Sequence, residues 1–234
     1  MFYVSLIIPT YNEAMNLPFL VEEIFNTVDK LQIDLELIII DDNSLDGTGR
    51  IADELSQRFP IKVVHRAGKL GLGSAVIEGF KHSDRPYLGV MDADLSHDPQ
   101  VLNQMVYFLN DYEIVLASRF EKGSVVEQWK WWRKLISEIG VFITMIMTGV
   151  KDPLTGYFFF RRSVIERVNL DTVGYKILLE ILIKGKYEKV KEIPFRFRSR
   201  KYSASKLNSK EYLLFLSQIV KYSWYKVINY LFNL

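Results

Sequence analysis

Cysteine is absent from the 234-residue sequence, and neither sign of charge dominates it. Without cysteine the chain forms neither disulfides nor thiolate metal sites, which fits a reducing compartment. Thirty Lys and Arg residues against 28 Asp and Glu residues leave a net charge of +2, so the overall charge gives no reason to expect nucleic acid as a partner. The length and the apolar fraction of 49% fit one folded α/β domain with a full hydrophobic core.

The sequence also lacks a signal peptide and a long uninterrupted apolar run. Residues 1–9 read directly as a strand, so we expect the domain to reside in the cytosol. Residues 129–150 and 212–234 are rich in aromatic and apolar residues, but charged residues such as Lys134 and Lys221 interrupt both stretches. Both are therefore poor membrane-spanning helices and fair interfacial ones. For the first stretch, a helix that packs on the core is an equal alternative.

Short apolar runs alternate with helical patterns through the first half of the chain. Residues 4–9 and 35–40 read as buried strands, and residues 13–31 between them carry apolar side chains at helical spacing. The elements expected next are a helix at 48–59, a strand at 61–64, a helix at 73–81 and strands at 87–91 and 113–117. This order predicts an α/β fold with a mostly parallel central sheet, helices on both faces, and ligands at the carboxyl ends of the strands.

Polar clusters follow three of the expected strands, at residues 10–13, 41–44 and 92–94. We expect the three to converge, because the carboxyl ends of parallel strands meet at one edge of a sheet. In the last cluster, Asp92 and Asp94 stand at alternate positions, which lets both carboxylates point the same way. Hard cations such as Mg²⁺ or Mn²⁺ favour oxygen ligands together with substrate phosphate, so the pair is a candidate metal site. Turn and helix-capping roles are the alternative for such a triplet.

Several other segments fit more than one role. Residues 41–48 can bind a base or ribose, or form only a turn and a helix cap. Residues 69–75 resemble a phosphate-cradling glycine loop but lack the spacing of a P-loop. Residues 152–156 read as a turn built on Pro and Gly. His65 and His97 have no ligand-like partner at suitable spacing, and we expect them to be ordinary polar residues.

Residues 196–206 form a basic segment in which aromatic residues separate some of the cations. Nucleic-acid binding is one interpretation. A loop that neutralises a diphosphate or a phosphorylated acceptor is more economical, because Arg and Lys near a metal-binding carboxylate complete the charge balance of phosphate chemistry. A solvated basic face is the third interpretation.

Together these segments resemble the polyprenol-phosphate (dolichol-phosphate) mannosyltransferases, within the inverting glycosyltransferase family 2, which is built on the nucleotide-sugar-binding GT-A fold. The likeness covers nearly the whole chain. It rests on eight segments, namely residues 8–13, 41–48, 71–75, 92–97, 118–120, 152–156, 174–176 and 205–207. Segments 9–13 and 92–94 are shared by many sugar transferases. The order of all eight, with Arg200 five residues before Ser205, is specific to the polyprenol-phosphate branch.

The resemblance implies roles for individual residues. The nucleotide-sugar site would contain Pro9, Tyr11, Glu13, Asp42, Asp92, Arg200 and Lys206. A divalent metal, Mg²⁺ or Mn²⁺, would be held by Asp92, Asp94 and Ser96. The catalytic set would be Asp92, Asp94, Arg119, Arg133, Arg200 and Lys206, whose cations handle phosphate, with Arg133 reaching from the interfacial helix toward a lipid phosphate. Some relatives carry Gln at the position of Ser96, and the family usually has Gly at that of Ser203.

The reaction implied by the resemblance is transfer of a hexose, mannose from GDP-mannose, to a polyprenyl monophosphate with inversion. Such a phosphate is largely dianionic near neutral pH, because its second pKa is about 6, so it needs no strong protein base. One alternative is a related transferase that uses UDP-glucose or another nucleotide sugar and a different lipid or glycan acceptor. Another is a catalytically silent nucleotide-sugar-binding subunit.

The expected organisation is a GT-A catalytic domain at residues 1–207, which includes an interfacial helix at 129–148, and a C-terminal amphipathic helix at 208–234. We expect peripheral attachment to the cytoplasmic face of a membrane. Members of the family carry C-terminal transmembrane helices or borrow them from another protein, so a membrane-anchoring partner subunit is a further expectation. No nucleic acid is expected as a partner.

Overall fold

The computed structural model describes residues 1–127, 131–171, 176–200 and 209–232, with side chains over 1–127, 140–171, 176–200 and 214–226. The strands are β1 (Phe2–Thr10), β2 (Ile33–Asp41), β3 (Ile61–His65), β4 (Tyr87–Val90), β5 (Ile114–Ser118), β6 (Val125–Val126), β7 (Phe158–Arg161), β8 (Val190–Pro194) and β9 (Arg196–Phe197). The helices are α1 (Leu17–Thr27), α2 (Thr48–Ser56), α3 (Leu72–Lys81), α4 (Leu102–Phe108), α5 (Trp131–Thr148), α6 (Ile177–Lys184) and α7 (Ser209–Phe232), with short 3₁₀ turns η1 (Pro99–Val101) and η2 (Arg162–Val164).

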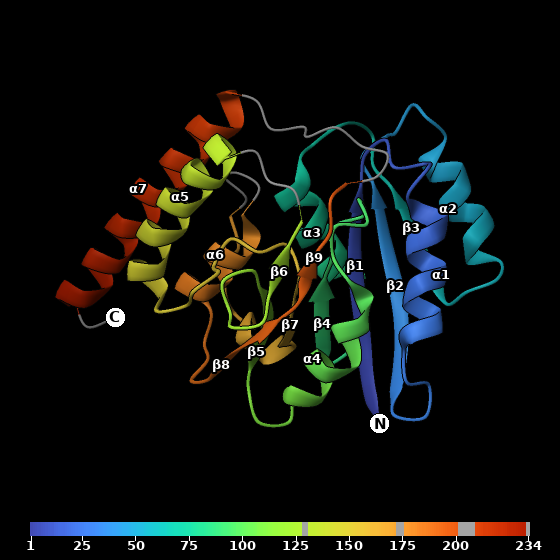
Figure 1. The fold of residues 1–234 in the computed structure, drawn as a ribbon, viewed down its shortest axis with the longest axis horizontal. Helices are drawn as coiled ribbons and strands as arrows, with labels where there is room; N and C mark the ends of the chain where they lie inside the picture. Colours follow the sequence, from blue (N-terminus) through green and yellow to red (C-terminus); the bar gives the residue numbers. More distant parts are fainter. Residues whose placement is uncertain (128–130, 172–175, 201–208, 233–234) are drawn as a thin grey trace.

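Seven strands form the central sheet in the order β3-β2-β1-β4-β7-β5-β8. Within this sheet β7 runs antiparallel to β4 and β5, and the other pairings are parallel. The chain begins at the lower end of β1 in Figure 1, so the carboxyl ends of the parallel strands lie toward the top of that view. The predicted α/β fold with a mostly parallel sheet is confirmed. Strand β7 was not among the strands expected from the sequence.

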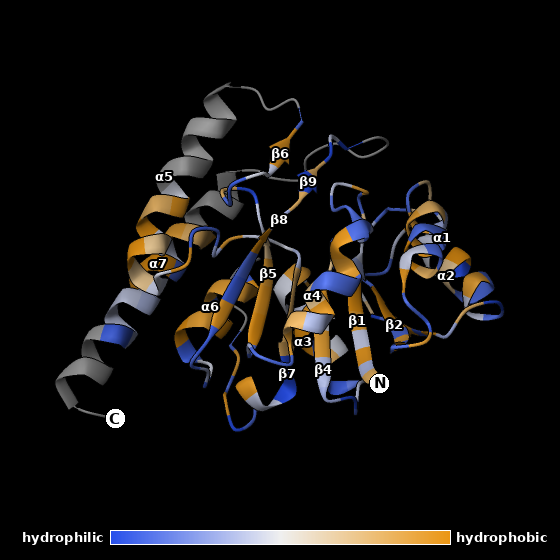
Figure 2. Cartoon of the chain, turned by 60° about the horizontal axis from the view of Figure 1, so that its bottom comes forward, coloured by the Kyte–Doolittle hydropathy of each residue, from blue (hydrophilic) through white to orange (hydrophobic). Residues whose placement is uncertain are grey.

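The two faces of the sheet are covered by different helices, as the side-chain alternation of β1 requires. Leu6 and Ile8 belong to one apolar cluster, which includes buried residues of α1, α2 and α4. Ile7 belongs to a second cluster on the opposite face, with buried residues of α3 and α6. Figure 2 shows the sheet strands as mostly hydrophobic, whereas the covering helices α1 and α2 also carry hydrophilic residues. The hydrophobic core therefore fills both sides of the sheet.

Helices α5 and α7 lie side by side at one end of the molecule (Figure 1). A third apolar cluster joins them to α6 and contains Val141, Leu154, Leu179, Phe215 and Tyr222. Where the structure describes them, both apolar stretches singled out in the sequence are thus largely helical, and each contributes buried side chains to this cluster. Among the helices described, none is long and apolar enough to cross a bilayer. The expected boundary between residues 207 and 208 stays a prediction.

Gly89 in β4 allows a close approach between strand and aromatic ring. A Cβ atom at this position would lie 2.2 Å from Cε1 of Phe159 and 3.0 Å from Cδ1 of Leu6. Both neighbours are fully buried side chains in the same apolar cluster. The ring of Phe159 therefore occupies the space that a side chain at position 89 would need.

We predict that Gly89→Ala lowers the free energy of unfolding by about 1–3 kcal/mol, the usual cost of overpacking a core. Urea denaturation measures this change. Gly68→Ala is the matched control, since a Cβ there meets nothing within 4 Å, and it should change stability by less than about 0.5 kcal/mol. A Gly89→Ala protein as stable as the wild type would contradict the packing described.

Candidate active site

Polar residues from β1, β2 and β4 meet at one edge of the sheet. These strands are neighbours in the order β2-β1-β4, and Thr10 stands opposite Asp41 in the β1–β2 register. The Thr10 hydroxyl donates to Oδ1 of Asp41 at 3.2 Å, and the backbone N–H of Asn12 donates to Oγ of Ser44 at 2.9 Å. The predicted convergence of the three strand ends is confirmed.

The residues expected around a nucleoside lie at the ends of β1 and β2. Pro9 is buried within β1, and Glu13 is 7% exposed with its carboxylate accepting from Nδ2 of Asn16. Tyr11 is partly exposed, and the ammonium of Lys69 lies 4.1 Å from the centre of its ring. Asp42 is 4% exposed. The four expected nucleoside residues therefore come together, with Lys69 next to them.

Asp42 anchors the glycine-containing segment that precedes α3. Its Oδ1 accepts from Nη1 of Arg66 at 2.5 Å, and its Oδ2 accepts from the backbone N–H groups of Leu70 and Gly71 at 3.1 and 2.9 Å. Gly71 has a φ of 100°, in the region that favours glycine. Asp42 thus holds residues 66–71 against the end of β2. The glycine-containing residues 69–75, which weakly resembled a phosphate loop in the sequence, thus include the backbone N–H groups that bind Asp42, and they do not form a P-loop.

Asp92 and Asp94 follow β4 directly and lie close together. Asp94 is 5% exposed, and its Oδ1 accepts from the backbone N–H and the hydroxyl of Ser96 at 3.1 and 2.5 Å. Its Oδ2 lies 2.6 Å from Nε of Arg200. Asp92 faces Gly156, where a Cβ atom would lie 2.6 Å from Oδ2 of Asp92. The glycine is therefore required for the Asp92 carboxylate to occupy this place.

The two carboxylates differ in their electrostatics. Burial raises the pKa of Asp92 above its ordinary value, and the negative charge of Asp94 adds to the increase. Burial also acts on Asp94, but the positive charge of Arg200 and the hydrogen bonds from Ser96 hold the pKa of Asp94 below its ordinary value. Asp94 is therefore the more firmly ionised member of the pair.

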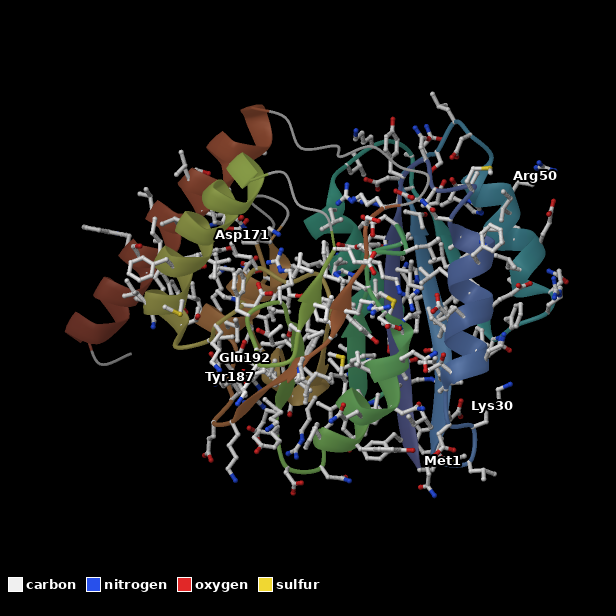
Figure 3. The ribbon with its side chains drawn as sticks, viewed as in Figure 1. Met1, Lys30, Arg50, Asp171, Tyr187 and Glu192 are labelled. Carbon is white, nitrogen blue, oxygen red and sulfur yellow. The ribbon has the colours of Figure 1, made fainter. Side chains whose placement is uncertain are left out.

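Arg119 lies beside the carboxylate pair but is held by Asp152. Its Nε and Nη2 donate to the two oxygens of Asp152 at 2.8 and 2.7 Å, and its backbone N–H donates to Oδ2 at 2.9 Å. Although burial alone would lower it, Asp152 raises the pKa of Arg119. Backbone N–H groups of residues 151 and 152 donate to Glu192, which Figure 3 labels. Asp152 is fully buried and binds Arg119, so residues 152–156 do more than form the simple turn expected from the sequence.

Lys176 belongs to the site and was not among the expected site residues. Its Nζ donates to the carbonyl of Leu154 at 2.8 Å. Burial lowers the pKa of Lys176 to about 8, and the charge of Arg119 contributes, against the opposing effect of Asp92 and Asp152. In the sequence, Lys176 lies in segment 174–176, one of the eight segments that carry the family resemblance. The spacing of its residues did not suggest a chemical role.

His97 is not an ordinary polar residue, and that expectation was wrong. It is 2% exposed, and its Nδ1 accepts from the backbone N–H of Asp92 at 3.3 Å. Its ring contacts the rings of Tyr157, Phe195 and Phe197. Burial lowers the pKa of His97, which favours the neutral imidazole needed to accept that bond. His65, by contrast, is an exposed residue beside Asp53.

In the described part of the basic segment, residues 196–200, arginines are tied to carboxylates rather than forming a uniformly solvated face, and residues 201–206 lie outside the described residues. Arg198 forms ion pairs with Glu23 and Asp98, each at 2.8 Å. Arg196 is exposed, with its Nε 3.9 Å from Glu127. Of the other expected cations, Lys206 and the side chain of Arg133 lie outside the described residues.

The carboxylates of Asp92 and Asp94 are the residues that could hold a metal. Within the ranges the structure describes, no group of three or more His, Asp or Glu side chains forms a metal-binding cluster. Two carboxylates present hard oxygen ligands of the kind that Mg²⁺ and Mn²⁺ take, with phosphate oxygens completing the coordination. The donor set therefore fits a cation that binds together with a phosphorylated ligand. The hydroxyl of Ser96 serves Asp94 as a donor.

We predict that Asp152→Asn lowers the free energy of unfolding by about 3 kcal/mol, because it leaves the buried charge of Arg119 without a counter-charge. Chemical denaturation measures the loss. Asp53→Asn is the control, since that side chain and its partner His65 are 55% and 52% exposed, and a change under about 0.5 kcal/mol is expected there. Equal effects of the two substitutions would argue against a structural ion pair at Asp152.

Comparison with known proteins identifies relatives of this chain. Residues 5–168 match the model of glycosyl transferase family 2. A dolichol-phosphate mannosyltransferase of Pyrococcus furiosus is 44% identical over 229 residues, which cover 94% of this chain and 64% of that protein. A dolichol-phosphate mannosyltransferase of Saccharomyces cerevisiae is 31% identical, over 92% of this chain and 85% of the yeast protein. A polyprenol monophosphomannose synthase of Mycolicibacterium smegmatis is 34% identical, over 86% of this chain and 80% of that protein. The chain thus spans somewhat less than two thirds of the length of the Pyrococcus relative.

Solved structures share the fold. A mannosyltransferase from Pyrobaculum calidifontis, in complex with GDP-Man and Mn²⁺, matches with a TM-score of 0.63 and 20% identity, over 97% of this chain and 64% of that one. Glucosyl-3-phosphoglycerate synthase from Mycobacterium tuberculosis, in complex with UDP, matches with a TM-score of 0.65 and 18% identity, over 93% and 80%. At these identities the likeness establishes the GT-A fold alone. The sequence matches go further and confirm the resemblance inferred from the eight motifs: the chain belongs to glycosyltransferase family 2.

Proposed function

We propose that this chain is an inverting glycosyltransferase that moves mannose from GDP-mannose to a polyprenyl monophosphate. The observation that carries the proposal is the placement of Asp92 and Asp94 among the cations Lys176, Arg119 and Arg200 at the carboxyl edge of the sheet. Such a site suits a reaction between two phosphorylated substrates. Three relatives named for this sugar and this class of lipid support the choice of substrates.

The donor nucleoside would bind at the ends of β1 and β2. The ring of Tyr11 is partly exposed at the end of β1, beside Lys69, and a bound base would contact it there. The buried Pro9 and Glu13 shape the end of β1. Because Asp42 already holds the backbone of residues 66–71, we assign it the role of positioning that segment around the nucleoside.

The donor diphosphate would lie beside Asp92 and Asp94. These two residues would hold a divalent cation, Mg²⁺ or Mn²⁺, and Ser96 would orient Asp94 through its hydrogen bonds. Once bound, the cation would supply positive charge to the departing diphosphate. Burial lowers the pKa of Lys176 to about 8, and the nearby charges of Asp92 and Asp152 oppose that shift, so its ammonium form adds positive charge at the same place near neutral pH.

The acceptor requires positioning and charge neutralisation rather than a base. A polyprenyl monophosphate is already largely dianionic near neutral pH, with a second pKa of about 6. The protein must bring this anion opposite the leaving diphosphate, which would invert the anomeric centre by in-line attack. From the resemblance, we assign contact with the lipid phosphate to Arg133 and contacts with the donor diphosphate to Arg200 and Lys206. Arg119 acts on the site through its charge, because its Nε and Nη2 already donate to Asp152.

The lipid part of the acceptor calls for contact with a membrane surface. Helices α5 and α7, which lie side by side, expose large apolar residues, namely Phe142, Ile143, Ile146, Leu214, Leu216, Val220, Trp224 and Tyr225. Exposed apolar and aromatic side chains on paired helices fit peripheral attachment at the interface of a bilayer. We propose that this face lies on the cytoplasmic leaflet, with a membrane-anchoring subunit as a further partner.

The donor and acceptor are tested by incubating the purified protein with a panel of nucleotide sugars, including GDP-mannose and UDP-glucose, a short polyprenyl phosphate and Mg²⁺ or Mn²⁺. Mass spectrometry should detect polyprenyl phosphomannose from GDP-mannose alone. Asp94→Asn should lower turnover by at least about 100-fold while leaving the fold intact, since electrostatic groups at such centres are typically worth 10²–10³ in rate. Product from UDP-glucose but not GDP-mannose would reject the assignment of the donor.

Membrane attachment predicts that Ile146→Asp combined with Val220→Asp weakens binding to phospholipid vesicles. Each side chain is 69% exposed. Burial of an aliphatic side chain is worth about 1.5–3 kcal/mol, so the loss should be roughly tenfold or more in a vesicle sedimentation assay. Leu31→Asp, at a residue 85% exposed in the connection between α1 and β2, is the control and should bind like the wild type. Equal binding of all three proteins would refute the proposed membrane-facing surface.

A further inference from the structure

Arg200 occupies a carboxylate that the proposed metal would need. Its Nε lies 2.6 Å from Oδ2 of Asp94, while Oδ1 accepts two hydrogen bonds from Ser96. Both oxygens of Asp94 therefore have protein donors. A divalent cation that took Oδ2 would have to replace the guanidinium, because two positive charges at one oxygen repel strongly in a site of low polarity.

Hydrogen bonds hold the backbone that leads to Arg200 as far as Ser199, whose N–H donates to Oε2 of Glu127 at 3.2 Å. Phe197 of β9 forms an antiparallel bridge with His97, and the backbone N–H of Arg198 donates to the carbonyl of Ser96 at 2.8 Å. The guanidinium of Arg198 is bound by Glu23 and Asp98. The side chain of Arg200 is 37% exposed, whereas that of Asp94 is 8% exposed. Arg200 thus reaches a buried partner from a solvent-accessible position, and it can leave without breaking the pairing at residues 197 and 198.

We propose that Arg200 couples metal binding to donor binding: it neutralises Asp94 until a diphosphate draws its guanidinium away, and its departure frees Asp94 for the metal. Arg suits this exchange because its planar fork pairs with phosphate as well as with carboxylate. The inference rests on the proposed function only for the identity of the incoming anion, a nucleoside diphosphate. The exchange explains why the site carries three cationic side chains although it is also expected to bind a divalent metal ion.

Coupling of this kind has a definite signature. The metal alone competes with Arg200 and binds weakly, whereas the metal and the diphosphate bind cooperatively. Because coupling between two ligands is reciprocal, the factor by which the diphosphate tightens the metal equals the factor by which the metal tightens the diphosphate. Removing the charge of Arg200 should strengthen binding of the metal alone and reduce that shared factor.

The test is a titration of the purified protein with Mn²⁺, alone and with GDP, read by the electron paramagnetic resonance of free Mn²⁺. For Arg200→Gln we expect Mn²⁺ alone to bind at least roughly 5-fold more tightly than to the wild type, the lower end of typical coupling. Arg200→Lys keeps the charge and should stay near the wild type. Arg196→Gln, at an exposed position on β9 four residues before Arg200, is the matched control and should leave both titrations unchanged.

Weaker or unchanged binding of Mn²⁺ by Arg200→Gln would overturn the proposal, as would equal tightening in Arg200→Lys. Adding Asp94→Asn to Arg200→Gln should remove the gain, and a gain that persisted would place the ion elsewhere and also overturn it. Thermal unfolding of each variant verifies that it is folded. No sugar or lipid is present in the titration, so its outcome is independent of whether mannose is the group transferred.

Discussion

The site depends on keeping two carboxylates together at the end of a buried strand. Asp92 and Asp94 repel one another and lose hydration, and the pKa of Asp92 rises as a result. Positive charge must therefore surround them, and it comes from Arg119, Lys176 and Arg200, on three segments far apart in the chain. The need to neutralise the two carboxylates at the end of β4 thus explains why segments from later in the chain pack at this edge of the sheet.

The antiparallel strand β7 makes that closure possible. It lies between β4 and β5, so its first residue stands at the edge where those two strands end. Residues 152–156, which precede β7, are therefore delivered directly to Asp92. Asp152 binds Arg119 there, and Gly156 leaves room for the Asp92 carboxylate, which a side chain would displace. The reversed direction of β7 in an otherwise parallel sheet therefore brings the residues that precede it into the site.

The helices at the far end of the sheet are connected to the same site. Lys221 of α7 pairs with Asp171, which Figure 3 labels beside α5 and α7. Asp171 also donates its backbone N–H to Glu180 of α6, and Glu180 is bound by Lys184. Lys176 directly precedes α6. The surface proposed to meet the lipid and the ammonium proposed to meet the phosphate thus belong to one packed unit of α6 and α7, which suits a reaction that joins a membrane lipid to a soluble donor.

The sequence by itself determined the α/β class, the ends of β1, β2 and β4, the carboxylate pair and the family. These features depend on periodicity and on contiguous motifs, both of which are local. It did not determine strand β7, the burial of Asp152, or the parts played by His97 and Lys176, and Arg133 and Lys206 stay predictions. Those outcomes arise from contacts between residues distant in sequence, such as Arg119 with Asp152 and Arg200 with Asp94. Only the tertiary structure decides them. Spacing along the chain shows which side chains share a face of a helix or strand, but it does not show which charged residues from distant segments are buried next to one another.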